Sequence, residues 1–288
     1  MKSFIYALLC LSLLFLYACQ SDAPAESTVP AATQVDENKK LIDSYIAKVN
    51  ANPNNHEENA KLLADAAAVN IKSKNFGPAV QYISQAIRNH YTASSTPANL
   101  LTLANIYSND MKAPAMGNAI KSAFVQAFPS NPKTGEIKTT LGEANIEDMI
   151  DASSKALYNE ETKRINQAKA REYINLCEIY AMTLPKSSKS PEYLFKAGET
   201  ARSIRQFPKA IDIYNWIYDK FQENDKAPQA LFLKAFTLDN DLKQKDAAKA
   251  LYEEFLKKYP NNDFADDTEF LLKNIGISDD DIIKGFGK

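Results

Sequence analysis

Histidine, tryptophan, cysteine and glycine are all scarce in this chain of 288 residues. It has 2 histidines, 1 tryptophan, 3 cysteines and 8 glycines. His56 and His90 alone cannot supply a histidine-rich zinc cluster or a recognisable catalytic triad, and we expect both on the surface. The formal net charge is only -2, so no strong field would attract nucleic acid. We therefore expect no metal, no cofactor and no nucleic-acid partner.

Signals for β-strands are missing as well. We find no run of alternating apolar and polar residues bounded by hairpin dipeptides. The composition is 45% hydrophobic and 24% charged, an ordinary balance for a globular chain. These features predict an all-α fold.

The first residues have the pattern of an export signal. Lys2 precedes an apolar run over 4–17, which is shorter than the roughly 20 residues of a membrane-spanning helix. The run ends in the letters LYAC, which resemble the lipobox of bacterial lipoproteins. That resemblance implies removal of residues 1–18 and a lipid on Cys19, although plain secretion or an uncleaved anchor stays open.

Residues 19–35 are rich in Ser, Ala, Pro and Thr, a composition that predicts a flexible tether. Each buried acyl methylene contributes about 0.8 kcal/mol, so two or three chains would give lasting attachment. Gln20 after the cysteine is similar to the outer-membrane sorting pattern of Gram-negative lipoproteins. We expect a lipid anchor in the outer membrane, on the periplasmic face rather than the cell surface.

Only Cys177 remains once the signal and the lipidated residue are set aside. It cannot form an internal disulfide, so packing must stabilise the domain. It lies in an apolar stripe with Tyr173, Tyr180 and Leu184. We therefore expect a buried thiol without chemistry.

Pairs of small residues recur about twelve positions apart, as expected where two antiparallel helices cross closely. The pairs are Ala67 with Ala79, Gly198 with Ala210, and Ala235 with Ala248, the last stretched by one residue. A fourth unit is weaker because Met116 stands where a small residue is expected. Trp216 is assigned to the core.

The ends and the middle of the chain depart from this pattern. A lone helix is expected at each end, over Asp36–Asn50 and Phe264–Asn274, and the middle segment has a long second helix over Glu160–Leu184. The expected segments are a signal peptide over 1–18, a lipidated cysteine and linker over 19–35, N-terminal repeats over 36–132, a degenerate middle repeat over 133–189, and C-terminal repeats with a cap over 190–288.

Three motifs in the last third carry a resemblance to a known family. They are YLFKA from Tyr193, ALFLKA from Ala230 and LYEEFL from Leu251. The stretch resembles tetratricopeptide-repeat lipoproteins of Bacteroidetes-type bacteria. The resemblance implies a right-handed solenoid of about five helix pairs with capping helices at both ends. It says little about function, since such repeats bind unrelated partners.

In that family the first helix of each pair lines a concave groove. The corresponding positions here are Phe195, Glu199, Arg202, Phe232, Phe236, Asp239, Leu101 and Asn105. For Phe232 and Phe236, packing between repeats is an equal alternative. We expect a non-enzymatic scaffold for a protein partner in envelope assembly or maintenance, and the alternative is a glycan or small-ligand binding lipoprotein of a nutrient-uptake system.

Overall fold

A computed structural model describes residues 31–277 of the chain. Within this range the secondary structure is helical, and the only bridge of β type is isolated, between Tyr158 and Ile165. The elements are α1 (Ala31–Ala51), α2 (His56–Lys72), α3 (Phe76–Asn89), α4 (Thr96–Asn105), the π-helix η1 (Ile106–Asp110), α5 (Pro114–Ala127), α6 (Thr134–Leu141), α7 (Ile146–Lys155), α8 (Gln167–Thr183), α9 (Lys189–Ser203), α10 (Phe207–Lys220), α11 (Lys226–Phe236), the π-helix η2 (Thr237–Asp241), α12 (Lys245–Lys258) and α13 (Ala265–Asn274).

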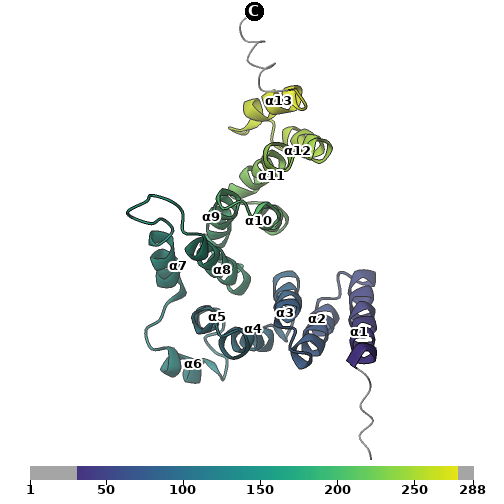
Figure 1. Cartoon of the computed structure of the whole chain (residues 1–288), viewed down its shortest axis with the longest axis vertical. Helices are drawn as coiled ribbons and strands as arrows, with labels where there is room; N and C mark the ends of the chain where they lie inside the picture. The colour runs from purple at the N-terminus through teal and green to yellow at the C-terminus, as the bar shows by residue number, and fades with distance from the viewer. Residues whose placement is uncertain (1–30, 278–288) are drawn as a thin grey trace, which may run out of the picture.

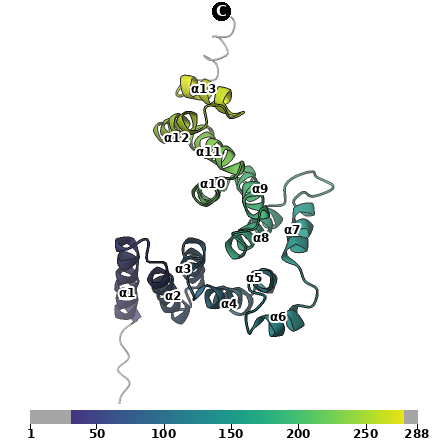
Figure 2. The same cartoon turned by 180° about the vertical axis from the view of Figure 1, so that it is seen from behind.

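Helices that follow each other along the chain pack against each other, except between α6 and α7, and form two arms that meet at an angle (Figure 1). Helices α1 to α5 form one arm and α8 to α13 the other, while α6 and α7 lie outside the bend (Figure 2). Contacts of α8 with α3 and α5 join the arms. The all-α expectation is confirmed.

The turns inside the helix pairs share one backbone device. Lys74, Lys112, Arg205 and Lys243 all have positive φ, between 55° and 62°. This left-handed conformation costs a residue with a Cβ about 1–2 kcal/mol. Its recurrence between α2 and α3, η1 and α5, α9 and α10, and η2 and α12 shows that these pairs are built alike.

The π-helices explain why the small-residue spacing varies. Ala67 and Ala79 are twelve apart, and α2 has no π turn, whereas η2 lies between Ala235 and Ala248, which are thirteen apart. A π turn holds one more residue than an α turn. The insertion therefore moves the second small residue one position along the chain.

The same insertion corrects the fourth unit. In this unit η1 follows α4. The small residue of α5 that packs against Ala104 is Gly117, thirteen positions further along the chain, rather than Met116. A Cβ at Gly117 would lie 2.7 Å from the carbonyl oxygen of Ala104 and even closer to Oγ of Ser108. The prediction that Met116 occupies the position of the small residue was wrong by one residue, because the sequence pattern did not include the π turn.

The crossing of α9 and α10 has the predicted small residue at its centre. A Cβ at Gly198 would lie 2.5 Å from Cε1 of Tyr214, whose side chain is fully buried. Tyr214 therefore packs directly on the α9 backbone, as the sequence spacing predicted.

Turns between successive pairs repeat as well. In the turn after α5, the backbone N–H of Asn131 donates a hydrogen bond to the carbonyl of Phe128. The turns after α3, α8, α10 and α12 contain the equivalent backbone bond. Because this turn follows α8, α8 is the last helix of the irregular middle segment, which consists of α6, α7 and α8. The prediction that a helix starts at Glu160 was wrong: Asn159 Oδ1 accepts bonds from the amides of residues 161 and 162, so a loop forms first, and Asn166 caps α8.

The core runs through both arms. Cys177 is fully buried, as predicted, and burial raises the pKa of its thiol to about 12. Trp216 is also buried. The lone end helices are present, although α1 already begins inside the predicted linker. The predicted signal peptide and Cys19 lie outside the described residues, and between 31 and 277 no helix has the length and apolar character to span a bilayer.

Candidate functional site

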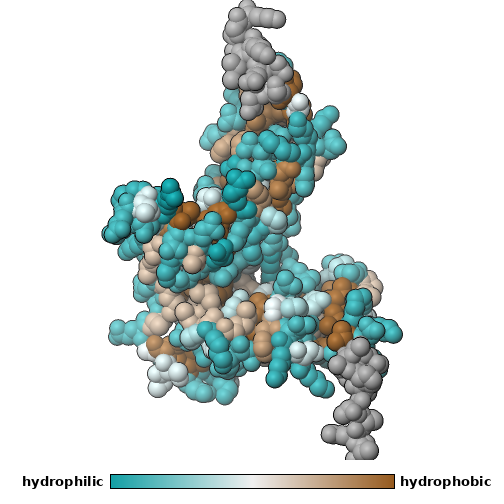
Figure 3. Space-filling model, viewed as in Figure 1, coloured by the Kyte–Doolittle hydropathy of each residue, from teal (hydrophilic) through white to brown (hydrophobic). Residues whose placement is uncertain are grey.

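A hollow lies at the inner angle of the two arms, where Figure 3 shows a notch between them. It has a volume of about 520 Å³. We call it the central cleft, and its walls include Gln81, Gln85 and Arg88 of α3, Glu178 of α8, and Lys209 and Asp212 of α10.

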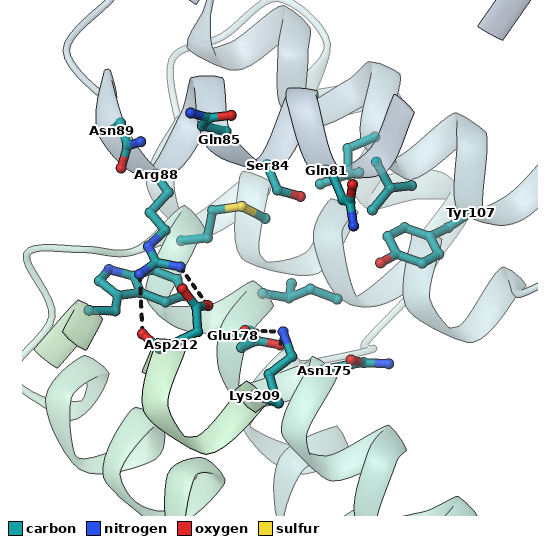
Figure 4. Close-up of a pocket in the computed structure, with 15 residues that line it drawn as sticks. Gln81, Ser84, Gln85, Arg88, Asn89, Tyr107, Asn175, Glu178, Lys209 and Asp212 are labelled. Carbon is teal, nitrogen blue, oxygen red and sulfur yellow. Dashed lines mark hydrogen bonds and ion pairs between the residues drawn. The ribbon is translucent and has the colours of Figure 1, made fainter. Parts of the chain in front are cut away.

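Arg88 connects the two arms across this cleft (Figure 4). Its Nη1 donates to Asp212 Oδ2 at 2.9 Å, and its Nη2 donates to the Asp212 carbonyl at 3.4 Å. The guanidinium also lies 4.2 Å from the centroid of the Trp216 ring. Because Arg88 is paired with Asp212 while its guanidinium stacks on the Trp216 ring, it covers one face of the only tryptophan in the chain.

A second ion pair also lines the cleft. Lys209 Nζ donates to both carboxylate oxygens of Glu178, at 3.0 and 3.1 Å. Burial raises the pKa of Glu178, and the nearby Lys209 opposes that rise. A buried carboxyl with a raised pKa is a feature of many catalytic sites. Here the ammonium occupies both oxygens, which is the arrangement of a structural pair.

Neutral polar side chains make up most of the remaining rim. Gln81, Gln85 and Asn89 follow each other along α3, and Asn175 lies on α8 (Figure 4). Within residues 31–277 none of these four side-chain amides forms a hydrogen bond, and neither does the hydroxyl of Ser84. By contrast, asparagines in the turns between pairs, such as Asn224, accept bonds from the backbone.

Three of the predicted groove residues lie together on a different surface. Phe195, Glu199 and Arg202 of α9 line two adjoining hollows of about 430 Å³ each, which share Glu199. We call this surface the α9 groove; it also includes Lys226 and Asp241. Lys226 Nζ lies 4.9 Å from the Phe195 ring centroid, and Arg202 Nε donates to Asp241 at 2.6 Å.

Glu199 is exposed, but partial desolvation raises the pKa of its carboxyl, and the nearby Lys226 partly opposes the shift. Phe236 is half-buried, with the Arg202 guanidinium 4.7 Å from its ring centroid. The groove therefore combines aromatic faces with charges of both signs.

The other predicted positions are more dispersed. Phe232 is buried and stacks on Phe264 with ring centroids 4.7 Å apart, so it packs between neighbouring helix pairs, the alternative to a place in the groove. Asp239 is half-buried beside Tyr252. Leu101 packs on the core of the first arm, and Asn105 is exposed there.

The expectation that both histidines are on the surface was wrong for His90. Its side chain is buried, and its Nδ1 lies 3.0 Å from Nδ1 of His56, which is exposed. Burial, together with the charges of His56 and Lys220, lowers the pKa of His90. The two residues meet because the turn after α3 folds back onto the start of α2. Among the described residues no cluster of three or more His, Cys, Asp or Glu side chains forms a metal site.

Sequence reasoning missed the central cleft entirely. Its walls come from helices far apart in the chain: Arg88 and Asp212 are separated by 124 positions. The row of amides on α3 was visible in the sequence, but nothing there indicated that α8 and α10 would face it. A scan against models of known protein families and a search of curated proteins found no match to this chain.

Proposed function

We propose that this chain is a lipid-anchored scaffold of tetratricopeptide type, held in the outer membrane on its periplasmic face, that binds a protein partner without catalysing a reaction. The repeated pairs with small crossing residues support a solenoid of this kind. The anchor rests on the lipobox-like letters before Cys19 and the apolar run that precedes them.

One observation carries the binding role: Phe195, Glu199 and Arg202 of α9 line two adjoining hollows that share Glu199. An aromatic side chain in a groove offers a large area that a partner can bury, and such residues often dominate interfaces. The adjacent Glu199, Lys226 and Arg202 supply charges of both signs that would orient the partner. A surface of this composition suits a segment of another protein.

The geometry favours a protein over a glycan. Sugar rings commonly stack on an exposed aromatic face, and the face of Trp216 is covered by Arg88. The groove phenylalanine is likewise partly covered, by Lys226. Neither site therefore presents the open aromatic platform of a sugar subsite.

Crosslinking capture from intact envelopes tests the proposal. A tagged chain should recover a defined protein, and Phe195→Ala should weaken that recovery by about 30-fold, the effect of a hot-spot residue worth about 2 kcal/mol. Tyr158→Ala is the matched control, since Tyr158 is an aromatic residue 60% exposed in the loop before α8, away from the groove. Circular dichroism establishes that both variants fold.

Capture of no defined protein by the parent chain would contradict the scaffold role. Equal recovery by Phe195→Ala and by the parent would instead place the partner elsewhere and remove the α9 groove from the proposal.

A further inference from the structure

The central cleft has the features of a second binding site, distinct from the α9 groove. We propose that it binds an extended, uncharged stretch of about five residues from a polypeptide, held through its main chain by the amide side chains of α3. The proposal rests on the proposed function in one respect, since it takes the occupant to be a protein segment.

The charges in the cleft favour an uncharged occupant. Arg88 is neutralised by Asp212 at 2.9 Å, and Lys209 is neutralised by Glu178 at 3.0 Å. An acidic or basic side chain entering the cleft would have to break one of these pairs or give up its own hydration. A neutral main chain displaces neither pair, so the cleft selects against charge.

Spacing along α3 fits an extended chain. Gln81, Gln85 and Asn89 are four positions apart, so they form a row with about 6 Å between neighbours. Every second residue of an extended peptide advances by about 6.6 Å. Three amides in a row can therefore reach alternate residues of a segment of about five, and the small mismatch is absorbed by flexible glutamine side chains.

The chemistry of the row fits a main chain as well. Each side-chain amide offers both a donor and an acceptor, the same combination that one backbone residue requires. Within residues 31–277 these three amides make no side-chain hydrogen bond, so no internal contact has to be broken. Asn175 provides a further amide on the facing wall (Figure 4).

The floor of the cleft is apolar. Ile179 and Met182 of α8 and Leu103 of α4 line it, each at most 6% exposed. In an extended segment alternate side chains point to opposite sides. Those directed at the floor should be small or medium apolar residues, and methionine can adapt its shape to them.

Selection from a display library of random 12-residue peptides on the purified full-length chain tests the site. Enriched peptides should share a window of about five residues without Asp, Glu, Lys or Arg. The Gln81→Ala/Gln85→Ala double variant should bind the selected peptides about 10- to 30-fold more weakly, the effect of losing two or three hydrogen bonds. Both positions are exposed on a helix where alanine is well tolerated.

The Asn118→Ala/Gln222→Ala double variant is the matched control, because it removes two exposed amides that lie outside both sites. It should bind the peptides as the parent does. Enrichment of peptides with charged residues throughout the window would overturn the proposal. So would equal binding by the two double variants, or enrichment of no peptide at all.

The two sites can be tested separately. If Phe195→Ala loses the envelope partner while the α3 double variant binds peptides normally, the cleft proposal fails and the scaffold function stands. If the α3 variant loses peptide binding but the parent captures no envelope protein, the scaffold function fails, and the cleft is a peptide site without an envelope partner.

Discussion

Adding one methyl group at Gly198 tests how closely α9 and α10 approach each other where they cross. The new Cβ would lie 2.5 Å from Cε1 of Tyr214 and 3.0 Å from Cδ1, whereas carbon atoms in contact are ordinarily about 3.5–4.0 Å apart. The ring is fully buried, so it can move only by displacing its neighbours. Such overpacking costs about 1–3 kcal/mol.

Alanine also gains helix propensity over glycine, by about 1 kcal/mol in a helix interior. The overlap of about 1 Å places the strain in the upper part of its range. We therefore expect Gly198→Ala to lower the free energy of unfolding by about 1–2 kcal/mol, or Tm by about 2–8 °C. Chemical and thermal unfolding followed by circular dichroism at the helix band measures both.

Gly77→Ala is the matched control. A Cβ at Gly77 meets nothing within 4 Å, so this change should be neutral or stabilising by up to about 1 kcal/mol. In a Tyr214→Val background, where the ring is absent, Gly198→Ala should lose its penalty. If Gly198→Ala stabilises the parent chain as much as Gly77→Ala does, the close approach of these helices is refuted.

Two further outcomes follow from His90 and from Cys19. The pKa of His90 is lowered in the folded chain, so as pH falls the unfolded chain takes up this proton first. The free energy of unfolding should therefore fall as pH drops below about 6.5. His90→Gln should make this dependence on pH less steep, as measured by urea titrations between pH 7.5 and 5.5. Identical slopes for parent and variant would contradict the burial of this imidazole. If Cys19 carries lipid, Cys19→Ala should move the chain from the membrane to the soluble fraction, while Cys10→Ala, inside the predicted signal, leaves it membrane-bound. Membrane retention of Cys19→Ala would refute lipidation.

Helix pairs could be predicted from the sequence because their determinants are local. Gly198 and Ala210 lie within one pair, and their spacing follows from helical periodicity and the need for small residues at a crossing. The same logic placed Phe195, Glu199 and Arg202 on one face of α9. It failed by one residue at Met116, since a π turn leaves no recognisable mark in the pattern of apolar residues.

The sequence by itself determined the regular helix pairs on either side of the middle segment and the burial of Cys177, because each depends on apolar and small residues spaced within a few turns of one another. Only the tertiary structure decided the angle between the arms and the pairing of Arg88 with Asp212, as well as the burial of His90, which follows from the turn after α3 folding back onto the start of α2. That angle arises where three helices replace the regular pair between α5 and α9. Contacts between residues more than a hundred positions apart depend on the sum of all intervening rotations, which no local pattern specifies.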